Sequence, residues 1–330
     1  MACHPGTLAA VDMTRWIGKH AWNIGLAALL AALLGVTKLI QPEFGVSGVE
    51  SLTRAALPFA FATAAMAVVV IVGGIDLSVA SMMAVTGVTA AVLMQHAGDG
   101  SSVAVTFLTL LVGVAMGTVN GSLVVLTKVP DIVVTLAMLF VWEGVALLIL
   151  EAPGGAVADW LMAAVVGGLG GVVDWVPRAL ILMVFCISVV WVPIKRSRLG
   201  LSIYATGSDR AAAFRSGVAV GRTRVAAYAV AGLFCALGGL SLTMITGIGE
   251  PVPGPYLLAS VAAVVLGGVT LGGGRGGLLG PIIAVFILRL IRLMLTLMAV
   301  DPNVTTIVEG AIMVIVVMIG GLLTLKGRRR

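Results

Sequence analysis

The sequence predicts an all-α fold: a polytopic bundle of about ten transmembrane helices in two related halves, with discontinuous helices that meet at glycine pairs. Of the 330 residues, 60% are apolar and only 10% are charged, whereas a soluble domain has about 25% charged residues. Long apolar runs follow one another along the chain, and one glycine-containing motif occurs twice. Too few charges remain to coat a water-exposed surface, so the expected solvent is the lipid bilayer.

Each predicted helix comes from an apolar run, because a bilayer core needs about 20 such residues. The qualifying runs lie near residues 22–40, 57–73, 77–96, 102–127, 130–150, 178–194, 225–246, 256–272, 278–299 and 303–325. We expect residues 1–330 to form a single transmembrane domain.

The basic residues indicate the orientation. Ten spans put both termini on one side, and Lys and Arg gather on the cytoplasmic side of membrane proteins. That side receives Arg15, Lys19, Lys128, Lys195, Arg196, Arg198, Arg210, Arg215, Arg222, Arg224, Arg275, Lys326, Arg328, Arg329 and Arg330. The other side receives Lys38, Arg54, Arg178 and the acids Glu43, Glu50, Asp99, Glu151, Asp159, Asp174, Glu250 and Asp301. Segments 1–21, 195–224 and 326–330 are therefore expected in the cytoplasm, and this orientation explains the net charge of +6 better than nucleic-acid binding does.

The repeated motif reads VIVGGIDL at 70–77 and VVLGGVTL at 264–271. Glycine-interrupted apolar segments in corresponding places of two halves indicate a translocation site, and irregular backbone at membrane depth must be surrounded by protein or water. The span count makes the two copies parallel, and an inverted repeat stays open. The predicted joint and pathway residues are Gly73, Gly74, Asp76, Ser78, Ser81, Gly267, Gly268 and Thr270.

Asp76 has two compatible interpretations. Its carboxylate can cap the helix that begins LSVASMMAV, by accepting free N–H groups of the first turn. Alternatively, it lines a polar pathway and touches the solute. Capping is the favoured interpretation.

A second group of charges lies within the last two spans. Arg289, Arg292 and Glu309 fall at similar depths if these spans are adjacent and antiparallel. An isolated charge in hydrocarbon is costly, so we expect an intramembrane ion pair between Glu309 and one of the arginines, with a structural role.

Catalytic and metal motifs are absent from the sequence. The run GGVTLGGGRGGLLG has no following G-K-[ST], so it is not a P-loop, and there is no GxSxG, HExxH or CxxC. We predict no enzyme activity, no metal and no cofactor. Any energy must come from a partner or from an ion gradient.

The basic segment 195–224 contains a short predicted helix. Ser208–Ser216 is rich in alanine, with Asp209 near its start and Gly217 after its end, which are helix start and stop signals. The segment either lies against anionic lipid or docks another protein.

Three stretches carry a resemblance to a known family. GGIDLSVAS, ATGSDRAAAFRSGV and VAAVVLGGVTLGGGRGGLLGP, in this order, resemble the membrane permeases of bacterial ribose/xylose-type (monosaccharide) ABC importers, over about Ala55 to Lys326. The resemblance implies an inner-membrane permease subunit for a monosaccharide or similar small polyol. It also implies three partners: a second permease copy, an extracytoplasmic solute-binding protein, and a cytoplasmic ATP-binding subunit that docks on residues 205–217. The implied coupling residues are Gly207, Asp209, Ala212, Ala213, Ser216 and Gly217.

Two departures and two alternatives accompany the resemblance. Ala211 stands where the family usually has Glu, and Ala80 where it usually has Gly. Related permeases carry nucleosides, branched-chain amino acids or signalling sugars, and the sequence separates these solutes poorly. A transporter of another class, coupled to ions, would need acids poised in the membrane. Asp76 fits that class, but the basic loop favours docking.

Overall fold

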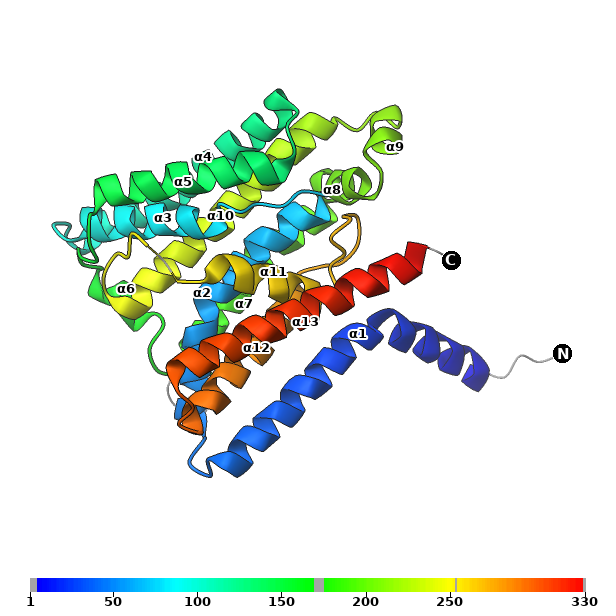
Figure 1. The fold of residues 1–330 in the computed structure, drawn as a ribbon, viewed down its shortest axis with the longest axis horizontal. Coiled ribbons are helices and arrows are strands. Elements are labelled where there is room, and N and C mark those ends of the chain that lie inside the picture. The colour runs from blue at the N-terminus through cyan, green and yellow to red at the C-terminus, as the bar shows by residue number, and fades with distance from the viewer. Residues whose placement is uncertain (1–4, 169–174, 253, 329–330) are drawn as a thin grey trace.

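The computed structural model describes residues 5–168, 175–252 and 254–328, and its regular elements there are helices (Figure 1). Residues 1–4 of the N-terminal segment, Asp174, and residues 329–330 of the basic tail lie outside this part. The helices are α1 (Pro5–Ile40), α2 (Val46–Ile71), α3 (Val79–Met94), α4 (Asp99–Thr127), α5 (Asp131–Ile149), α6 (Asp159–Ala163), α7 (Arg178–Arg196), α8 (Arg198–Ser208), α9 (Arg210–Arg215), α10 (Val220–Thr246), α11 (Tyr256–Leu266), α12 (Leu279–Leu297) and α13 (Pro302–Arg328).

The predicted helical bundle is confirmed, and each of the ten apolar runs contains most or all of its residues in a helix. Among the described residues, seven helices are long and apolar enough to cross a membrane, while α3 and α11 are shorter. The 11 residues of α11 extend only about 16 Å. The run 256–272 therefore begins as a short helix and continues as a loop, rather than forming one complete span.

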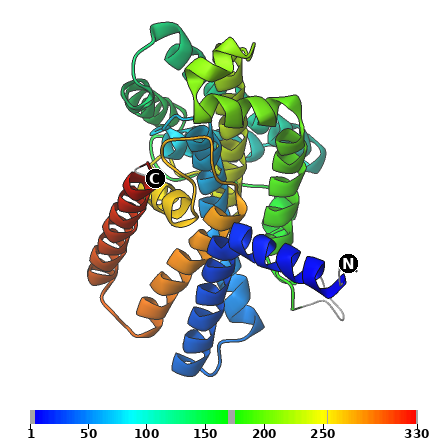
Figure 2. The same cartoon turned by 90° about the vertical axis from the view of Figure 1, so that its right-hand side faces the viewer.

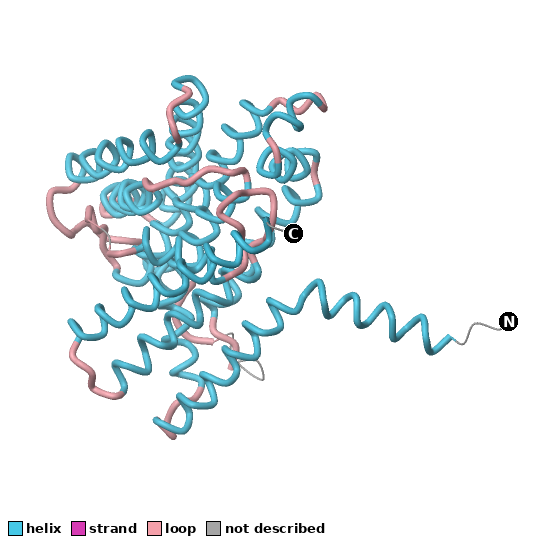
Figure 3. Tube along the Cα trace, turned by 45° about the vertical axis from the view of Figure 1, so that its right-hand side comes forward, coloured by secondary structure: helices cyan, strands magenta, loops and turns pink. Residues whose placement is uncertain are grey.

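Helix α2 forms the centre of the bundle (Figure 2). It packs against α10, α12, α11 and α7, and its residues from Ala56 to Ile71 are all buried. The alanine-rich sequence FAFATAAMA lets neighbouring helices approach closely, as small residues do in membranes. The N-terminal part of α1 instead extends away from the bundle (Figure 3).

Helices α4 and α10 touch through glycines. Gly113, Gly117 and Gly121 recur every four residues along α4, so they share one face. A Cβ atom on Gly117 would overlap the backbone carbonyl of Tyr228, and one on Gly113 would overlap that of Gly232. The absence of side chains at these positions allows the two backbones to meet.

Both glycine pairs end helices with the same hydrogen-bond pattern. After α2, Gly73 has a φ of 87°, its N–H donates to Val70 O over 2.9 Å, and Gly74 N–H donates to Val69 O over 2.9 Å. This is a Schellman motif, which favours glycine at its left-handed position.

After α11, Gly268 takes the left-handed position, with a φ of 81°. Its N–H donates to Val265 O over 3.0 Å, and Val269 N–H donates to Val264 O over 3.2 Å. The sequence repeat aligns Gly73 with Gly267, yet the left-handed residue is the first glycine of one pair and the second of the other.

The loop that follows the second joint reaches the first joint, and the relative direction of the two copies stays a prediction. Gly274, in the loop after α11, donates its N–H to Ile71 O at the end of α2 over 2.8 Å. Helix α2 has 26 residues, more than its predicted run 57–73. Its glycine pair therefore follows a full-length helix and does not interrupt a span midway.

Candidate functional site

The basic segment folds into two short capped helices, α8 and α9. Asp209 caps α9, because its Oδ1 accepts the N–H groups of Ala211 and Ala212 over 2.8 and 2.9 Å. Gly217 ends α9 with a φ of 83°, and its N–H donates to Phe214 O over 3.0 Å. The predicted helix with an N-terminal acid and a C-terminal glycine is confirmed.

The pKa of the Asp209 carboxyl lies below its ordinary value of 3.8, first because of the hydrogen bonds from Ala212 and Ala211, and also because of the nearby charge of Arg215. The only acid of this helix is thus engaged at its N-terminus.

The predicted coupling residues divide between two faces. Gly207 and Ala213 are buried and Ala212 is half-buried, whereas Asp209, Ser216 and Gly217 are exposed. Phe214 is 72% exposed and Leu201 is 73% exposed. Neither exposed apolar side chain was predicted from the sequence; the signal for Phe214 is a single aromatic residue in a helix that is otherwise alanine and arginine.

The buried face of α8 meets both glycine loops at a glycine junction, which consists of Gly73, Gly207, Gly273 and Gly274. A Cβ atom on Gly207 would overlap Ile71 O, and one on Gly273 would lie 2.9 Å from the Cα of Gly73. Backbone therefore contacts backbone here with no side chain between.

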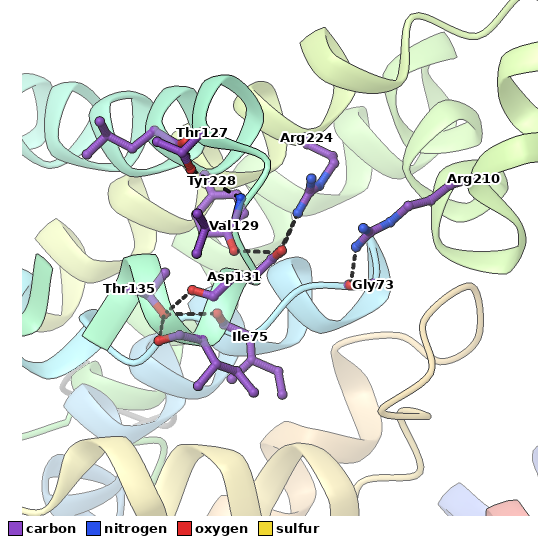
Figure 4. Close-up of polar contacts among 11 residues, drawn as sticks. Gly73, Ile75, Thr127, Val129, Asp131, Thr135, Arg210, Arg224 and Tyr228 are labelled. Atoms are coloured by element: carbon purple, nitrogen blue, oxygen red, sulfur yellow. Dashed lines mark hydrogen bonds and ion pairs between the residues drawn. The ribbon is translucent and has the colours of Figure 1, made fainter. Parts of the chain in front are cut away.

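Arg210, the first residue of α9, adds a side-chain contact to this junction. Its Nη2 donates to Gly73 O over 2.6 Å (Figure 4). On α8, the Tyr204 hydroxyl donates to Gly276 O over 2.8 Å. Helices α9 and α8 thus contact the loops that follow α2 and α11, respectively.

Asp76 is fully buried in a network just before α3. Its Oδ1 accepts from the N–H and the hydroxyl of Ser78 over 2.9 and 2.6 Å. Asn120 of α4 donates to the Ser78 hydroxyl over 2.7 Å, and Trp142 of α5 donates to Asn120 Oδ1 over 3.0 Å. The favoured capping interpretation of Asp76 is therefore wrong: Ser78 is the residue before α3, and no side chain caps this helix. Asp76 instead orders the start of α3 by accepting two hydrogen bonds from Ser78. A contact with solute stays a prediction.

The other predicted joint residues make local contacts. Ser81 Oγ donates to Ser78 O over 3.0 Å, and Thr270 Oγ1 donates to Gly273 O over 3.0 Å. Trp22 of α1 donates to Leu266 O over 2.9 Å and lies against Gly268. The second joint is thus held by α1, a contact that the sequence repeat does not indicate.

A second polar cluster was missed in the sequence. Asp131, at the start of α5, forms an ion pair with Arg224 of α10 and accepts the Tyr228 hydroxyl over 3.0 Å (Figure 4). One turn later, Thr135 Oγ1 lies 3.2 Å from Ile75 O, to which it donates. The sequence signal that could have indicated this cluster is Asp131 itself. It is an acidic residue at the end of a predicted span, on the side that carries most of the Lys and Arg residues.

The predicted intramembrane charges also lie together. Arg292 Nη1 lies 3.1 Å from Glu309 Oε2, so α12 and α13 are joined by an ion pair. The Arg289 guanidinium lies 3.7 Å from the centre of the Phe59 ring, as in a cation–π contact. Whether these residues act only as structural support stays a prediction.

The fold and site define the class: a polytopic membrane protein whose basic loop packs directly on its central helix. The chain belongs to the family described as "Branched-chain amino acid transport system / permease component", which it matches over residues 48–317. Its relatives include the "Autoinducer 2 import system permease protein LsrD" of Escherichia coli (strain K12) and of Shigella flexneri. Each is 29% identical over 320 residues, which cover 91% of this chain and 92% of the relative. No solved structure matches the chain.

The chain is therefore the permease subunit of an ATP-binding-cassette importer and a multi-pass protein of the inner membrane. Its relatives are transport subunits rather than enzymes. Permeases of this kind work with an ATPase subunit and a binding protein.

Proposed function

We propose that this permease imports a monosaccharide or a similar small polyol. The observation that carries the proposal is the likeness to LsrD over nine-tenths of both chains, together with the three motifs of monosaccharide permeases. Autoinducer 2, the solute in the name of these relatives, is a specific second candidate. The family description names branched-chain amino acids, so leucine is also tested as a solute.

The ATPase subunit docks on residues 205–217 in this proposal. The exposed Phe214 side chain supports it, because buried aromatic anchors dominate many protein interfaces. Arg215, the next residue, is exposed and offers a charge to an acidic partner surface. Ordered ends at Asp209 and Gly217 hold these groups in a defined place.

The remaining partners follow from the orientation. Residues 1–330 act as one transmembrane domain with both termini, the 195–224 loop and the 326–330 tail in the cytoplasm. The solute-binding protein then meets the opposite face, where Glu151, Asp159 and Asp301 are exposed. A second permease, identical or related, completes the pathway.

Docking is tested by co-purification. The wild-type permease is expressed with the ATP-binding subunit from the same gene neighbourhood and isolated through a tag on the permease. We expect the ATPase to be retained, and Phe214→Ala to reduce retention about tenfold or more, as for an interface anchor. Trp175→Ala, at an exposed aromatic residue on the opposite face, is the matched control. Full retention by Phe214→Ala contradicts this docking surface.

The solute is tested in proteoliposomes that contain the permease, the ATPase and the binding protein. ATP-dependent uptake of labelled ribose, autoinducer 2 and leucine is compared at equal concentration. Uptake of ribose or autoinducer 2 supports the proposal, whereas uptake of leucine alone contradicts it. Proton-dependent uptake without the ATPase indicates a secondary transporter.

A further inference from the structure

We propose that Arg210 is a positioning residue that couples ATP hydrolysis to transport by tethering helix α9 to the joint between α2 and α3. The inference rests on the proposed docking of the ATPase on residues 205–217. It assigns to Arg210 a role toward the interior of the permease, and not toward the ATPase.

The tether is a hydrogen bond between α9 and the joint. The Arg210 guanidinium donates to Gly73 O over 2.6 Å, which joins residues 137 positions apart. Hydrogen bonds from a charged donor are short and about twice as strong as neutral ones. Arg210 directly follows the cap residue Asp209, so the tether is anchored at the ordered end of α9.

A close backbone contact lies next to the tether. At the glycine junction, α8 lies against the end of α2 without intervening side chains, and a Cβ atom on Gly207 would overlap Ile71 O. Close-packed interiors have no free space to absorb displacement. A shift of α8 and α9 must therefore move the residues after α2.

Hydrogen bonds connect this joint to α4 and α5. Ile75 O accepts the Thr135 hydroxyl of α5, and Asp76 is bonded through Ser78 to Asn120 of α4. The joint is thus attached to both helices of the α4–α5 pair, as Figure 4 shows for α5. A displacement of Gly73 is passed to these helices as a rigid-body movement.

Helix α9 has a second attachment at its other end. The chain continues from α9 into α10, where Arg224 pairs with Asp131 at the start of α5. Both ends of α9 are therefore linked to α5, one through Arg210 and the joint, and the other through Arg224. Without Arg210, α9 keeps the link through Arg224 and the backbone contact of α8 with the end of α2, so a docked ATPase moves the joint less completely when it moves α9.

The test compares Arg210→Met with the wild-type importer in proteoliposomes that contain the ATPase and the binding protein. Methionine keeps an unbranched side chain but donates no hydrogen bond. We expect ATPase co-purification and ATP hydrolysis to remain, while solute imported per ATP hydrolysed falls about fivefold or more, the lower end of coupling between distant sites. Arg210→Lys, which keeps a donor, should recover part of the ratio.

The matched control is Arg222→Met, which removes an exposed arginine of the same basic loop and should leave the ratio unchanged. A wild-type ratio in Arg210→Met overturns the tether, and so does loss of ATPase binding in that variant, because Arg210 is then a docking residue. If Arg210→Met fails to accumulate in the membrane, Arg210→Lys decides: a lowered ratio supports the tether and a wild-type ratio overturns it. Failure of the wild-type permease to bind the ATPase contradicts the docking proposal instead.

Discussion

At the scale of single residues, the capping role of Asp209 changes the pKa of its carboxyl group. The residue opens α9 by accepting two backbone N–H groups, and these bonds favour the charged carboxylate. The pKa of Asp209 is therefore lowered from 3.8. A carboxylate with a depressed pKa stabilises the folded helix above its ordinary pKa, and this stabilisation disappears as the pH falls through the depressed value.

The cap of α9 should therefore be insensitive to pH across the physiological range. We expect hydrogen-exchange protection factors at Ala211 and Ala212 to stay constant from about pH 8 to 5 and to fall only below about pH 4. Asp209→Ala should lower protection at every pH. Asp209→Asn, which still accepts a hydrogen bond, is the control that removes titration. Loss of protection in the wild type between pH 7 and 5 would contradict this account.

At the scale of helices, glycine decides how closely elements approach. The face of α4 that carries Gly113, Gly117 and Gly121 lies on α10. Van der Waals packing is a main source of helix association in membranes, so this face should contribute strongly to stability. Glycines with open surroundings, such as Gly144 of α5, carry no such requirement.

Gly117→Leu should destabilise the bundle by about 1–3 kcal/mol or more, as overpacking does in a filled interior, because the new side chain meets the Tyr228 carbonyl. The measurement is thermal unfolding of the purified permease in detergent. Gly144→Leu, at an open position, is the matched control and should unfold close to the wild-type temperature. Equal unfolding temperatures for both variants would show that α4 and α10 are not in close contact.

At the scale of the whole molecule, an ion pair joins the last two helices. The Arg292–Glu309 pair links α12 to α13, and α12 packs on α1 and α2. The pair is partly buried, with the two side chains 41% and 12% exposed, and a charge left unpaired within the membrane is costly. The pair should therefore matter for assembly more than for solute choice.

Glu309→Gln should lower the amount of folded permease in the membrane while leaving the relative uptake of different solutes unchanged. Fluorescence-detected size exclusion measures the folded fraction, and competition between labelled solutes measures selectivity. Thr306→Val, at an exposed residue of the same helix, serves as the control. Normal assembly with altered selectivity would place Glu309 in the solute pathway.

The helices and their ends were predictable because their signals are local. Apolar run length marks a helix in lipid, Asp209 and Gly217 mark the ends of α9, and the glycine pairs mark the ends of α2 and α11. The repeat could not show which glycine becomes left-handed, since Gly73 and Gly268 occupy different places in the aligned pairs. The glycine that becomes left-handed depends on the residue at which each helix ends, and this residue is set by how the helix packs against its neighbours.

A membrane bundle with a capped helix in a basic loop can be predicted from the residue order alone, because hydrophobicity and capping act over a few residues. The central place of α2, the Asp131–Arg224 pair and the contact of Arg210 with Gly73 become visible only in the folded protein. These partners lie far apart in the chain, so their contacts exist only after the helices have packed. The contacts of α8 and α9 with the ends of α2 and α11 are of this long-range kind.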